Sequence, residues 1–341
     1  MQRILIILFG ILCGVIGLLV GIYWTSQRSS KSDLLLLPKK TSTPLTKYAI
    51  PNLEQTLIPA GNFKIENKIS DSEDFTSYLF EFNFYPTLNT DDKSKTTSGI
   101  VNIPKGKGPF PAVLLIRGYV DQSIYQTGMG SRSAAEFFAE NGYITVAPDF
   151  LGYADSDPEA ENIFEARFQT YTTILSLLHL MKEKTLFDKT DISYNGEVSI
   201  WAHSNGGQIA LTALAITKQE IPTVLWAPVT KPFPYNILYY TDESGDEGEF
   251  IRSELAKFED LYEAGLYDFT KYLANINAPI QLYQGGADDA VPVGWSSEFV
   301  AEMQKNNNKI EYIVYKNADH NLRPDWDKAI TQSLLFFESS R

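Results

Sequence analysis

The segment that most constrains the fold of this chain is residues 202–207, in which alanine, histidine, serine, asparagine and two glycines follow one another. A β-favouring run, residues 198–201, precedes it, and a run of small, helix-favouring residues, 207–214, follows it. A serine at the tip of a tight turn between a strand and a helix is typical of a nucleophile elbow, whose flanking residues must be small. Gly206 stands two residues after Ser204, whereas the residue two before it is alanine, where the motif has glycine. The pattern predicts a strand, a strained turn and a helix with Ser204 as the candidate nucleophile, and a chance match to a short motif is the alternative.

One of the three histidines of the chain stands where a catalytic base is expected. His320 follows a predicted strand, residues 311–315, on a loop, where rigid scaffolds present catalytic groups. His179 lies in an apolar helical pattern and is expected to be structural, and His203 precedes the serine and is expected to support the turn. A neutral imidazole can take the proton of a serine hydroxyl during attack and return it to the leaving group. We therefore predict that His320 is the base.

The acid that would orient this imidazole is expected in residues 285–292, a turn that follows a predicted buried strand, 279–284. The turn carries two neighbouring carboxylates, Asp288 and Asp289. A carboxylate fixes the tautomer of the imidazole and stabilises the imidazolium that forms. We predict Asp288 because it lies closer to the end of the strand, and Asp289 is the alternative.

Two backbone N–H groups are candidates for an oxyanion hole, which stabilises the negative charge of a tetrahedral intermediate. In a nucleophile elbow one donor is the residue after the nucleophile, here Asn205, and the other comes from a loop after an earlier strand. The predicted strand 112–116 is followed by Gly118, which allows a close approach, and by Tyr119, whose N–H is the second predicted donor. The ring of Tyr119 is expected either to contact substrate or to pack beside the turn.

Short segments spread along the chain together resemble one known family. They are residues 78–80, 101–106, 108–113, 117–119, 141–143, 147–153, 202–207, 285–292 and 319–322. The chain resembles an α/β-hydrolase with a prolyl-oligopeptidase-type (peptidase S9) catalytic domain, a group that shades into dienelactone-hydrolase-like esterases, over roughly residues 48–338. The resemblance implies that Ser204, Asp288 and His320 form a catalytic triad.

Two features depart from the family pattern. Arg117 stands where a histidine is usual before the glycine. The hydrogen bonds of this side chain are therefore not predicted, whereas the backbone N–H donor is unaffected. Full prolyl oligopeptidases carry a propeller, which needs at least about four blades of roughly 40 residues each. The segment before the hydrolase core is too short to hold one, so the resemblance implies the fold more strongly than a peptidase activity.

The order of predicted elements also indicates an α/β fold. Alternating runs at residues 78–85 and 98–103 predict antiparallel strands on the N-terminal side of the sheet. From residue 112 onward, strands alternate with helical patterns, which is typical of a parallel sheet covered by helices on both faces. We therefore expect an α/β-hydrolase fold with a mainly parallel central sheet over residues 48–341.

Residues 230–277 form a long insertion between two predicted strands, at a position that commonly hosts a lid or cap in this fold. The insertion combines aromatic residues with an acidic run. One interpretation is a lid that contacts substrate. The other is a solvent-exposed helical segment whose aromatic side chains pack against the rest of the domain. Tyr235 of the insertion and Trp295 after it are predicted substrate contacts, together with the ring of Tyr119.

Residues 4–24 contain no charged side chain, and these 21 residues are enough to cross about 30 Å of hydrocarbon as a helix. A cleaved signal peptide is the alternative, but the segment lacks a small-x-small cleavage site, and Tyr23 and Trp24 suit a membrane interface. We expect a single-pass anchor in the cell membrane, a flexible linker over residues 25–47, and a catalytic domain outside the cytoplasm.

The composition restricts the partners of this chain. The predicted membrane helix would carry a stripe of glycines that permits close helix–helix approach and a homodimer: Gly10, Gly14, Gly17 and Gly21. The net charge of −13 argues against binding nucleic acid and against electrostatic capture by anionic lipid. The only cysteine is Cys13, no Cys/His cluster has metal-ligand spacing, and no glycine-rich phosphate loop follows the first strand. We expect neither a metal nor another cofactor.

Two classes of function agree with these residues. The first is a membrane-anchored serine hydrolase that cleaves a carboxylic ester, or a peptide or amide bond, through an acyl-enzyme. The second is a catalytically silent α/β-hydrolase domain that serves as a binding or interaction module. The predicted triad favours the first class.

Overall fold

The structure is a computed structural model that describes residues 42–184, 186–187, 191–241 and 244–341. The chain divides into two compact units, Met1–Thr43 and Pro44–Arg341, and the helices and strands that the structure describes lie in the second. The predicted membrane helix, residues 4–24, and its glycine stripe lie outside the described residues. Among the described residues, no helix has both the length and the apolar composition that crossing a membrane requires.

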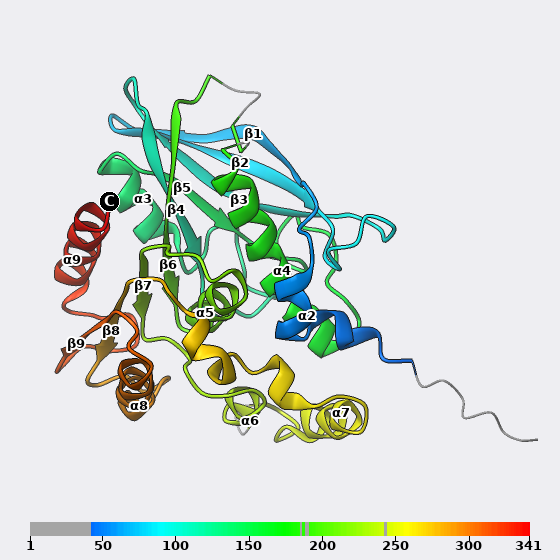
Figure 1. The fold of residues 1–341 in the computed structure, drawn as a ribbon. Coiled ribbons are helices and arrows are strands. Elements are labelled where there is room, and N and C mark those ends of the chain that lie inside the picture. Colours follow the sequence, from blue (N-terminus) through cyan, green and yellow to red (C-terminus); the bar gives the residue numbers. More distant parts are fainter. Residues whose placement is uncertain (1–41, 185, 188–190, 242–243) are drawn as a thin grey trace, which may run out of the picture. The chain divides into compact units, whose positions relative to one another are not determined.

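In the described part of the second unit, a single sheet of nine strands forms the centre (Figure 1). Its strand order is β1-β2-β3-β5-β4-β6-β7-β8-β9. The first three strands and β5 pair antiparallel, and the strands from β5 across to β9 run parallel to one another. The strands are β1 (Asn62–Asp71), β2 (Phe75–Phe84), β3 (Lys95–Pro104), β4 (Phe110–Ile116), β5 (Ile144–Pro148), β6 (Tyr194–His203), β7 (Thr223–Trp226), β8 (Ile280–Gly285) and β9 (Ile310–Tyr315). The predicted α/β fold with a mainly parallel sheet is confirmed.

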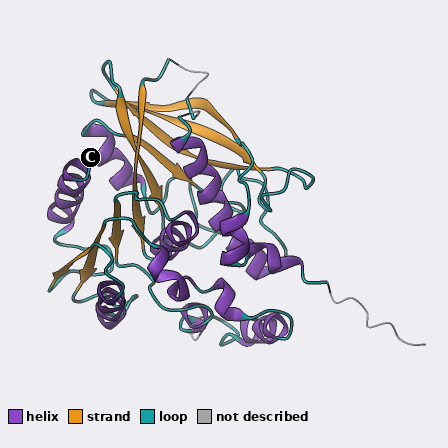
Figure 2. Ribbon diagram, in the orientation of Figure 1, coloured by secondary structure: helices purple, strands orange, loops and turns teal. Residues whose placement is uncertain are grey.

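Helices cover both faces of this sheet (Figure 2). The alternation of side chains along β4 divides its residues between the two faces. Leu114 lies in one core cluster with residues of α4, α5 and α8, whereas Val113 and Leu115 lie in a second cluster with residues of α3 and α9. Because both faces are covered, β4 is apolar almost throughout. These helices are α3 (Arg132–Glu140), α4 (Ile163–Lys182), α5 (Asn205–Thr217), α8 (Val293–Lys305) and α9 (Trp326–Ser339).

The folded unit begins earlier than the sequence predicts. A short 3₁₀ helix, η1 (Pro44–Tyr48), precedes α2 (Ile50–Gln55), and Leu45 and Tyr48 are buried. The hydroxyl of Tyr48 donates a hydrogen bond of 3.0 Å to Oε1 of Glu165 in α4. The predicted linker, residues 25–47, therefore extends too far, because apolar side chains within a polar stretch pack against α4.

The insertion at residues 230–277 is helical and partly built into the core. It holds α6 (Tyr235–Leu238), α7 (Glu249–Glu259), η3 (Ala264–Tyr267) and η4 (Phe269–Asn275). Phe258 and Tyr267 are buried, with ring centroids 4.9 Å from Phe164 and 4.8 Å from Phe168 of α4, respectively. Asp246 of the acidic run accepts hydrogen bonds from backbone N–H groups at the start of α7. The ring contacts agree with the interpretation in which aromatic residues of the insertion pack against the rest of the domain. The hydrogen bonds of Asp246 give its carboxylate a structural role.

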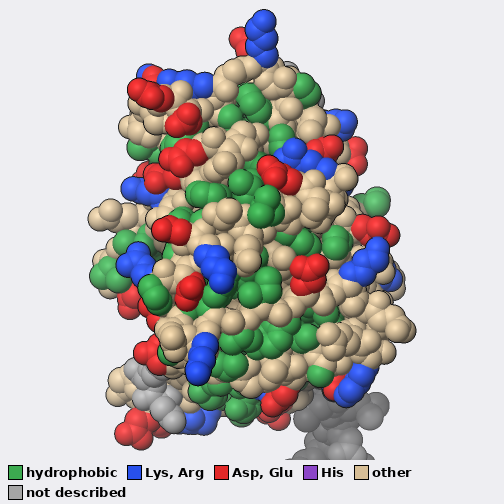
Figure 3. Space-filling view, turned by 90° about the vertical axis from the view of Figure 1, so that its left-hand side faces the viewer, with side chains coloured by type: hydrophobic (Ala, Val, Ile, Leu, Met, Phe, Trp, Pro, Cys, Tyr) green, Lys and Arg blue, Asp and Glu red, His purple; other side chains and the backbone are tan. Residues whose placement is uncertain are grey.

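The surface shown in Figure 3 carries acidic and basic side chains interspersed among polar and apolar ones. This face is the one that lies to the left in Figure 1, beside α9. A mixture of both signs is typical of a solvated protein surface.

Candidate active site

Ser204 occupies a strained turn between β6 and α5. Its backbone has φ 55° and ψ −124°, a conformation that a residue with a side chain rarely adopts and that costs on the order of 1–3 kcal/mol. Two hydrogen bonds, to the last residue of β7 and to the loop after it, hold the turn: the N–H of Ser204 donates to the carbonyl of Trp226 (2.9 Å), and its carbonyl accepts from the N–H of Val229 (3.0 Å). The turn has the geometry predicted for a nucleophile elbow.

Close packing explains why glycines flank this turn. A Cβ atom on Gly206 would lie 2.1 Å from the carbonyl oxygen of Ile116, so no larger residue fits there. A Cβ atom on Gly118 would lie 2.9 Å from Cβ and 3.4 Å from Oγ of Ser204. The loop after β4 therefore lies directly against the candidate nucleophile.

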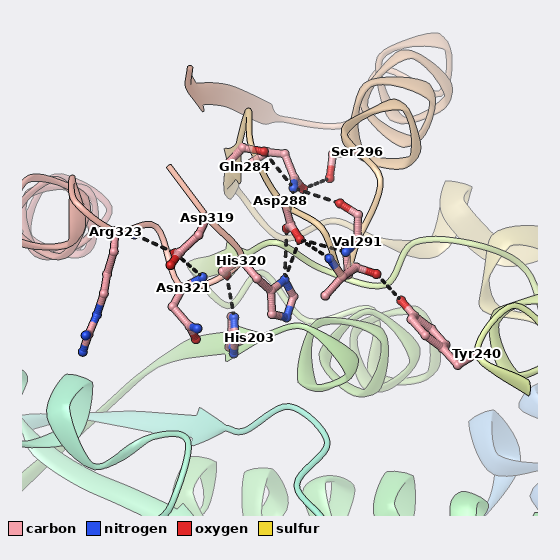
Figure 4. Close-up of polar contacts among 12 residues, drawn as sticks. His203, Tyr240, Gln284, Asp288, Val291, Ser296, Asp319, His320, Asn321 and Arg323 are labelled. Atoms are coloured by element: carbon pink, nitrogen blue, oxygen red, sulfur yellow. Dashed lines mark hydrogen bonds and ion pairs between the residues drawn. The ribbon is translucent and has the colours of Figure 1, made fainter. Parts of the chain in front are cut away.

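His320 and Asp288 form a partly buried hydrogen-bonded pair (Figure 4). Nδ1 of His320 lies 3.1 Å from Oδ1 and 3.0 Å from Oδ2 of Asp288. The Asp288 side chain is fully buried, whereas 18% of the His320 side chain is exposed. The imidazole thus has one nitrogen fixed by a carboxylate, which is the geometry that a histidine base requires.

Asp288 is held by three further donors. Oδ1 accepts hydrogen bonds from the N–H groups of Ala290 (2.9 Å) and Val291 (2.8 Å). Oδ2 accepts one from Nε2 of Gln284 (2.7 Å). Burial alone would raise the pKa of Asp288, but the hydrogen bonds from His320, Val291 and Ala290 outweigh it and lower the pKa below its ordinary value. The carboxylate is therefore kept ionised.

Gln284 is a member of this site that the sequence reasoning missed. It is buried at the end of β8, and Oγ of Ser296 donates a hydrogen bond of 2.7 Å to its Oε1. This contact orients the amide so that its Nε2 faces Asp288. The sequence feature that could have indicated Gln284 is an amide side chain near the end of β8, a strand that is otherwise largely apolar.

The structure separates the two acidic candidates. Asp289 is exposed, and in the part of the chain that the structure describes it makes no hydrogen bond or ion pair with His320. Asp288 alone of the two carboxylates contacts the imidazole.

His203 supports the loop that carries His320. Its Nε2 lies 3.0 Å from the carbonyl oxygen of His320, and the two ring centroids are 4.6 Å apart. Because a carbonyl only accepts, this nitrogen carries the proton. Burial, followed by repulsion from the charge of His320, lowers the pKa of His203 to about 4, so the ring is neutral near neutral pH. His179 lies far along α4 and is half-buried, as a structural role requires.

The described residues show no hydrogen bond from Oγ of Ser204 to His320. The two residues are linked through His203, which precedes the serine and whose ring lies beside that of His320. In structures without substrate such catalytic hydrogen bonds are often long and tighten only when substrate binds.

The predicted oxyanion donors border a cavity of about 280 Å³. Gly118, Tyr119 and Asn205 belong to its lining, together with residues of α4 and the loop before it. The Tyr119 side chain is 74% exposed, so its ring lies at the surface rather than packed beside the turn. The two residues predicted to supply the oxyanion donors thus line one cavity. Asn205 directly follows Ser204, and Gly118, which precedes Tyr119, packs against Ser204.

The other two predicted substrate contacts, Tyr235 and Trp295, are not among the residues that line this cavity, and neither are Ser204 and His320. The residues that line the cavity fall between Arg117 and Ile209 in sequence, whereas Tyr235 and Trp295 lie beyond this range. Trp295 is buried, and its ring lies 4.6 Å from that of Tyr239 and 6.0 Å from that of Tyr235. These aromatic residues pack on one another. In the described ranges, no group of three or more His, Cys, Asp and Glu side chains could hold a metal ion.

Comparisons with known proteins agree with this geometry. The model of the prolyl oligopeptidase family (peptidase S9) matches residues 130–338. A protein of Escherichia coli (strain K12), provisionally named a carboxymethylenebutenolidase, is 24% identical over 221 residues, which cover 64% of this chain and 70% of that protein. The resemblance expected from the sequence is confirmed.

Solved structures show a shared fold. Acetyl xylan esterase 1 from Thermoanaerobacterium sp. JW/SL YS485 has a TM-score of 0.60 at 16% identity, covering 85% of this chain and 92% of that one. The acetyl xylan esterase from Paenibacillus sp. R4 also has a TM-score of 0.60 at 16% identity, covering 89% and 96%. The Pyrococcus furiosus esterase Pf2001 has a TM-score of 0.52 at 18% identity, covering 81% and 91%. At these identities the likeness concerns the fold alone.

Proposed function

Because the chain belongs to the prolyl oligopeptidase family, a group of α/β-hydrolases, we propose that it is a serine hydrolase that cleaves a carboxylic ester through an acyl-enzyme. The observation that carries the proposal is the partly buried pair of Asp288 and His320 beside the strained turn of Ser204. A hydroxyl is a poor nucleophile at neutral pH, and an oriented imidazole is what activates it. The same groups could cleave a peptide or amide bond, which is the alternative substrate class.

In the proposed acylation step, Oγ of Ser204 attacks the carbonyl carbon of the ester while Nε2 of His320 takes the hydroxyl proton. The carbonyl oxygen becomes an oxyanion that accepts hydrogen bonds from the N–H groups of Tyr119 and Asn205. His320 then gives its proton to the leaving alcohol, and the acyl group stays on Ser204.

In the proposed deacylation step, His320 takes a proton from water, and the resulting hydroxide attacks the acyl carbon. The second oxyanion collapses, the acid leaves, and Ser204 recovers its proton from the imidazolium. Asp288 keeps Nδ1 protonated in both steps, and its own three further donors keep it ionised.

Two observations support a small ester as substrate. The cavity of about 280 Å³ beside Asn205 is near the lower end of the range of small-molecule sites. The E. coli relative bears the name of a lactone-cleaving enzyme, and a lactone is a cyclic ester.

A fluorophosphonate probe tests the mechanism, because it labels a serine only when its hydroxyl is activated. We expect the wild-type chain to be labelled at Ser204 and Ser204→Ala to remain unlabelled. A panel of p-nitrophenyl esters of short and long acids, beside aminoacyl and prolyl amides, then identifies the bond that is cleaved. A folded wild-type chain without labelling or turnover would contradict the proposal and favour a silent binding module.

We further propose that residues 4–24 anchor the enzyme in the cell membrane with the catalytic domain outside the cytoplasm. The length of this uncharged segment and the aromatic pair Tyr23 and Trp24 support the proposal. The glycine stripe of Gly10, Gly14, Gly17 and Gly21 supports contact between two such helices.

A further inference from the structure

The loop that carries Tyr119, one of the two predicted oxyanion donors, also contains a buried arginine, Arg117, to which the proposed reaction assigns no role. Arg117 is only 4% exposed, and in the described part of the chain its guanidinium forms no ion pair. A buried charge without a counter-charge is costly and is rarely kept unless it makes strong hydrogen bonds. Arg117 therefore needs an explanation beyond filling space.

Both terminal nitrogens of this guanidinium are bound to backbone carbonyls. Nη1 donates a hydrogen bond of 2.9 Å to the carbonyl of Gly118, and Nη2 donates one of 2.7 Å to the carbonyl of Asp149. The second bond ties the loop after β4 to the end of β5. A planar fork that reaches two acceptors at once is a property of arginine and not of lysine.

Aromatic rings enclose the same guanidinium and fix its plane. Its central carbon lies 4.0 Å from the ring centroid of Tyr153, 4.5 Å from that of Tyr125 and 5.4 Å from that of Phe150. Ring faces attract a cation and partly replace its lost hydration. Tyr125 also donates a hydrogen bond of 2.6 Å to the buried carboxylate of Asp149, which brings a negative charge behind the ring. The cage leaves Arg117 little freedom to move.

The carbonyl that Arg117 holds belongs to the peptide group of the predicted oxyanion donor. The C=O of Gly118 and the N–H of Tyr119 lie in one plane, and in a trans peptide they point in opposite directions. Fixing the carbonyl oxygen thus fixes the direction of the N–H. A charged donor on the carbonyl also polarises the peptide and strengthens its N–H as a donor.

This peptide lies against the nucleophile. A Cβ atom on Gly118 would be 3.4 Å from Oγ of Ser204, and Arg117, Gly118, Tyr119 and Asn205 line the same cavity. We propose that Arg117 is a positioning residue that aims the N–H of Tyr119 at the oxyanion. The inference rests on the proposed serine-hydrolase function and assigns to the residue that departs from the family pattern a task in that reaction.

The experiment compares Arg117→Lys and Arg117→Gln with wild type in the full chain. Arg132→Lys is the matched control, because Arg132 is exposed and also donates to a backbone carbonyl, that of Thr127. The probe substrate is p-nitrophenyl acetate, and the probe inhibitor is phenylboronic acid, which forms a tetrahedral adduct on an active serine. Rates are expressed per active site, counted by fluorophosphonate labelling of Ser204, so that loss of folded protein does not count as loss of rate.

Loss of one oxyanion donor typically lowers kcat by about 10²–10³-fold. We expect Arg117→Gln to lower kcat per active site by about 10²-fold and Arg117→Lys by about tenfold, with KM within about threefold of wild type. The inhibition constant of phenylboronic acid should rise in parallel with the fall in kcat/KM, because both report stabilisation of a tetrahedral state. Arg132→Lys should match wild type in every measurement.

A purely structural role predicts fewer active sites with unchanged kcat at each of them, and this result in both variants would overturn the inference. Failure of both variants to fold while Arg132→Lys folds would overturn it too, since Arg117 would then serve stability alone. A wild-type chain without labelling or turnover contradicts the serine-hydrolase proposal itself, and the inference falls with it. Wild-type activity together with fully active Arg117 variants contradicts the positioning role only.

Discussion

The ring of His203 holds the main chain of His320, a residue 117 positions further along the sequence. The Nε2–H of His203 donates to the carbonyl of His320, and the two rings lie 4.6 Å apart. His203 directly precedes Ser204, so one side chain connects the turn of the candidate nucleophile to the loop of the candidate base. Movement of either loop is therefore coupled to the other.

The first prediction concerns the nucleophile and the base. Ser204→Ala and His320→Ala should each lower kcat on the hydrolysed ester by on the order of 10⁴-fold or more, because the two groups act as a unit. His179→Ala is the matched control and should keep wild-type kcat, since His179 lies on α4 away from the site. The measurement is steady-state turnover of proteins whose folding is verified by circular dichroism. Retention of a tenth of wild-type kcat by either variant would show that another mechanism operates.

The second prediction concerns the acid. Asp288→Asn should lower kcat strongly, by about 10²–10⁴-fold, because an amide cannot hold the imidazole in the required tautomer. Asp289→Asn should leave kcat within about twofold, since this exposed side chain does not contact His320. Both variants change the same charge by the same amount, so each controls for the other. The reverse ranking would assign the acid to Asp289.

The third prediction concerns the pH dependence of stability. Burial and the charge of His320 lower the pKa of His203 to about 4, whereas a histidine in an unfolded chain has a pKa of about 6.5. As pH falls from about 6.5 to 4, the unfolded chain binds a proton at this residue that the folded chain does not bind, so the free energy of unfolding decreases. This contribution is complete above about pH 6.5 and is lost as pH falls toward 4.

Urea unfolding of the wild type and of His203→Gln at pH 7.5 and pH 4.5 measures this contribution. Glutamine can still donate to the carbonyl of His320 but does not titrate. We expect the free energy of unfolding to fall less between the two pH values in the variant than in the wild type. Equal losses in the two proteins would show that His203 is not held neutral by the fold.

The fourth prediction concerns the proposed anchor. The full chain should stay with membranes through high-salt and alkaline carbonate washes, because hydrophobic insertion is not screened by ions. A chain without residues 1–30 should be soluble and should keep wild-type ester turnover, since the described unit begins at Pro44. Recovery of the full chain in the wash, or a mature N-terminus near residue 25, would identify the segment as a cleaved signal.

Local sequence was informative where short-range geometry decides the structure. The turn at Ser204 was predictable because a strand, small residues and a helix follow one another without interruption. Asp288 was preferred to Asp289 because it lies closer to the end of β8, and Asp288 is the carboxylate that pairs with His320. The start of the folded unit was placed too late because Leu45 and Tyr48 stand in a stretch of polar composition.

Side-chain contacts that belong to no motif could not be read from the sequence. Gln284 gains its role from Asp288 on one side and Ser296 on the other, and neither contact has a local pattern. Trp295 packs with Tyr235 and Tyr239 of the insertion, and its contact with substrate stays a prediction. Aromatic residues near a predicted site satisfy packing and binding equally well in a sequence, so the pattern alone does not distinguish the two roles.

The parallel arrangement of β4, β6, β8 and β9 has a consequence for how such an enzyme can be altered. Gly118, Ser204, Asp288 and His320 each follow one of these strands, so the sheet brings them to the same edge. The insertion at residues 230–277 joins β7 to β8 and enters at this same edge. Because Phe258 and Tyr267 of the insertion pack against α4, whereas the residues that line the cavity lie between Arg117 and Ile209, substitutions in the loops after β4 and β5 are the route to a new substrate preference that leaves the reacting groups unchanged.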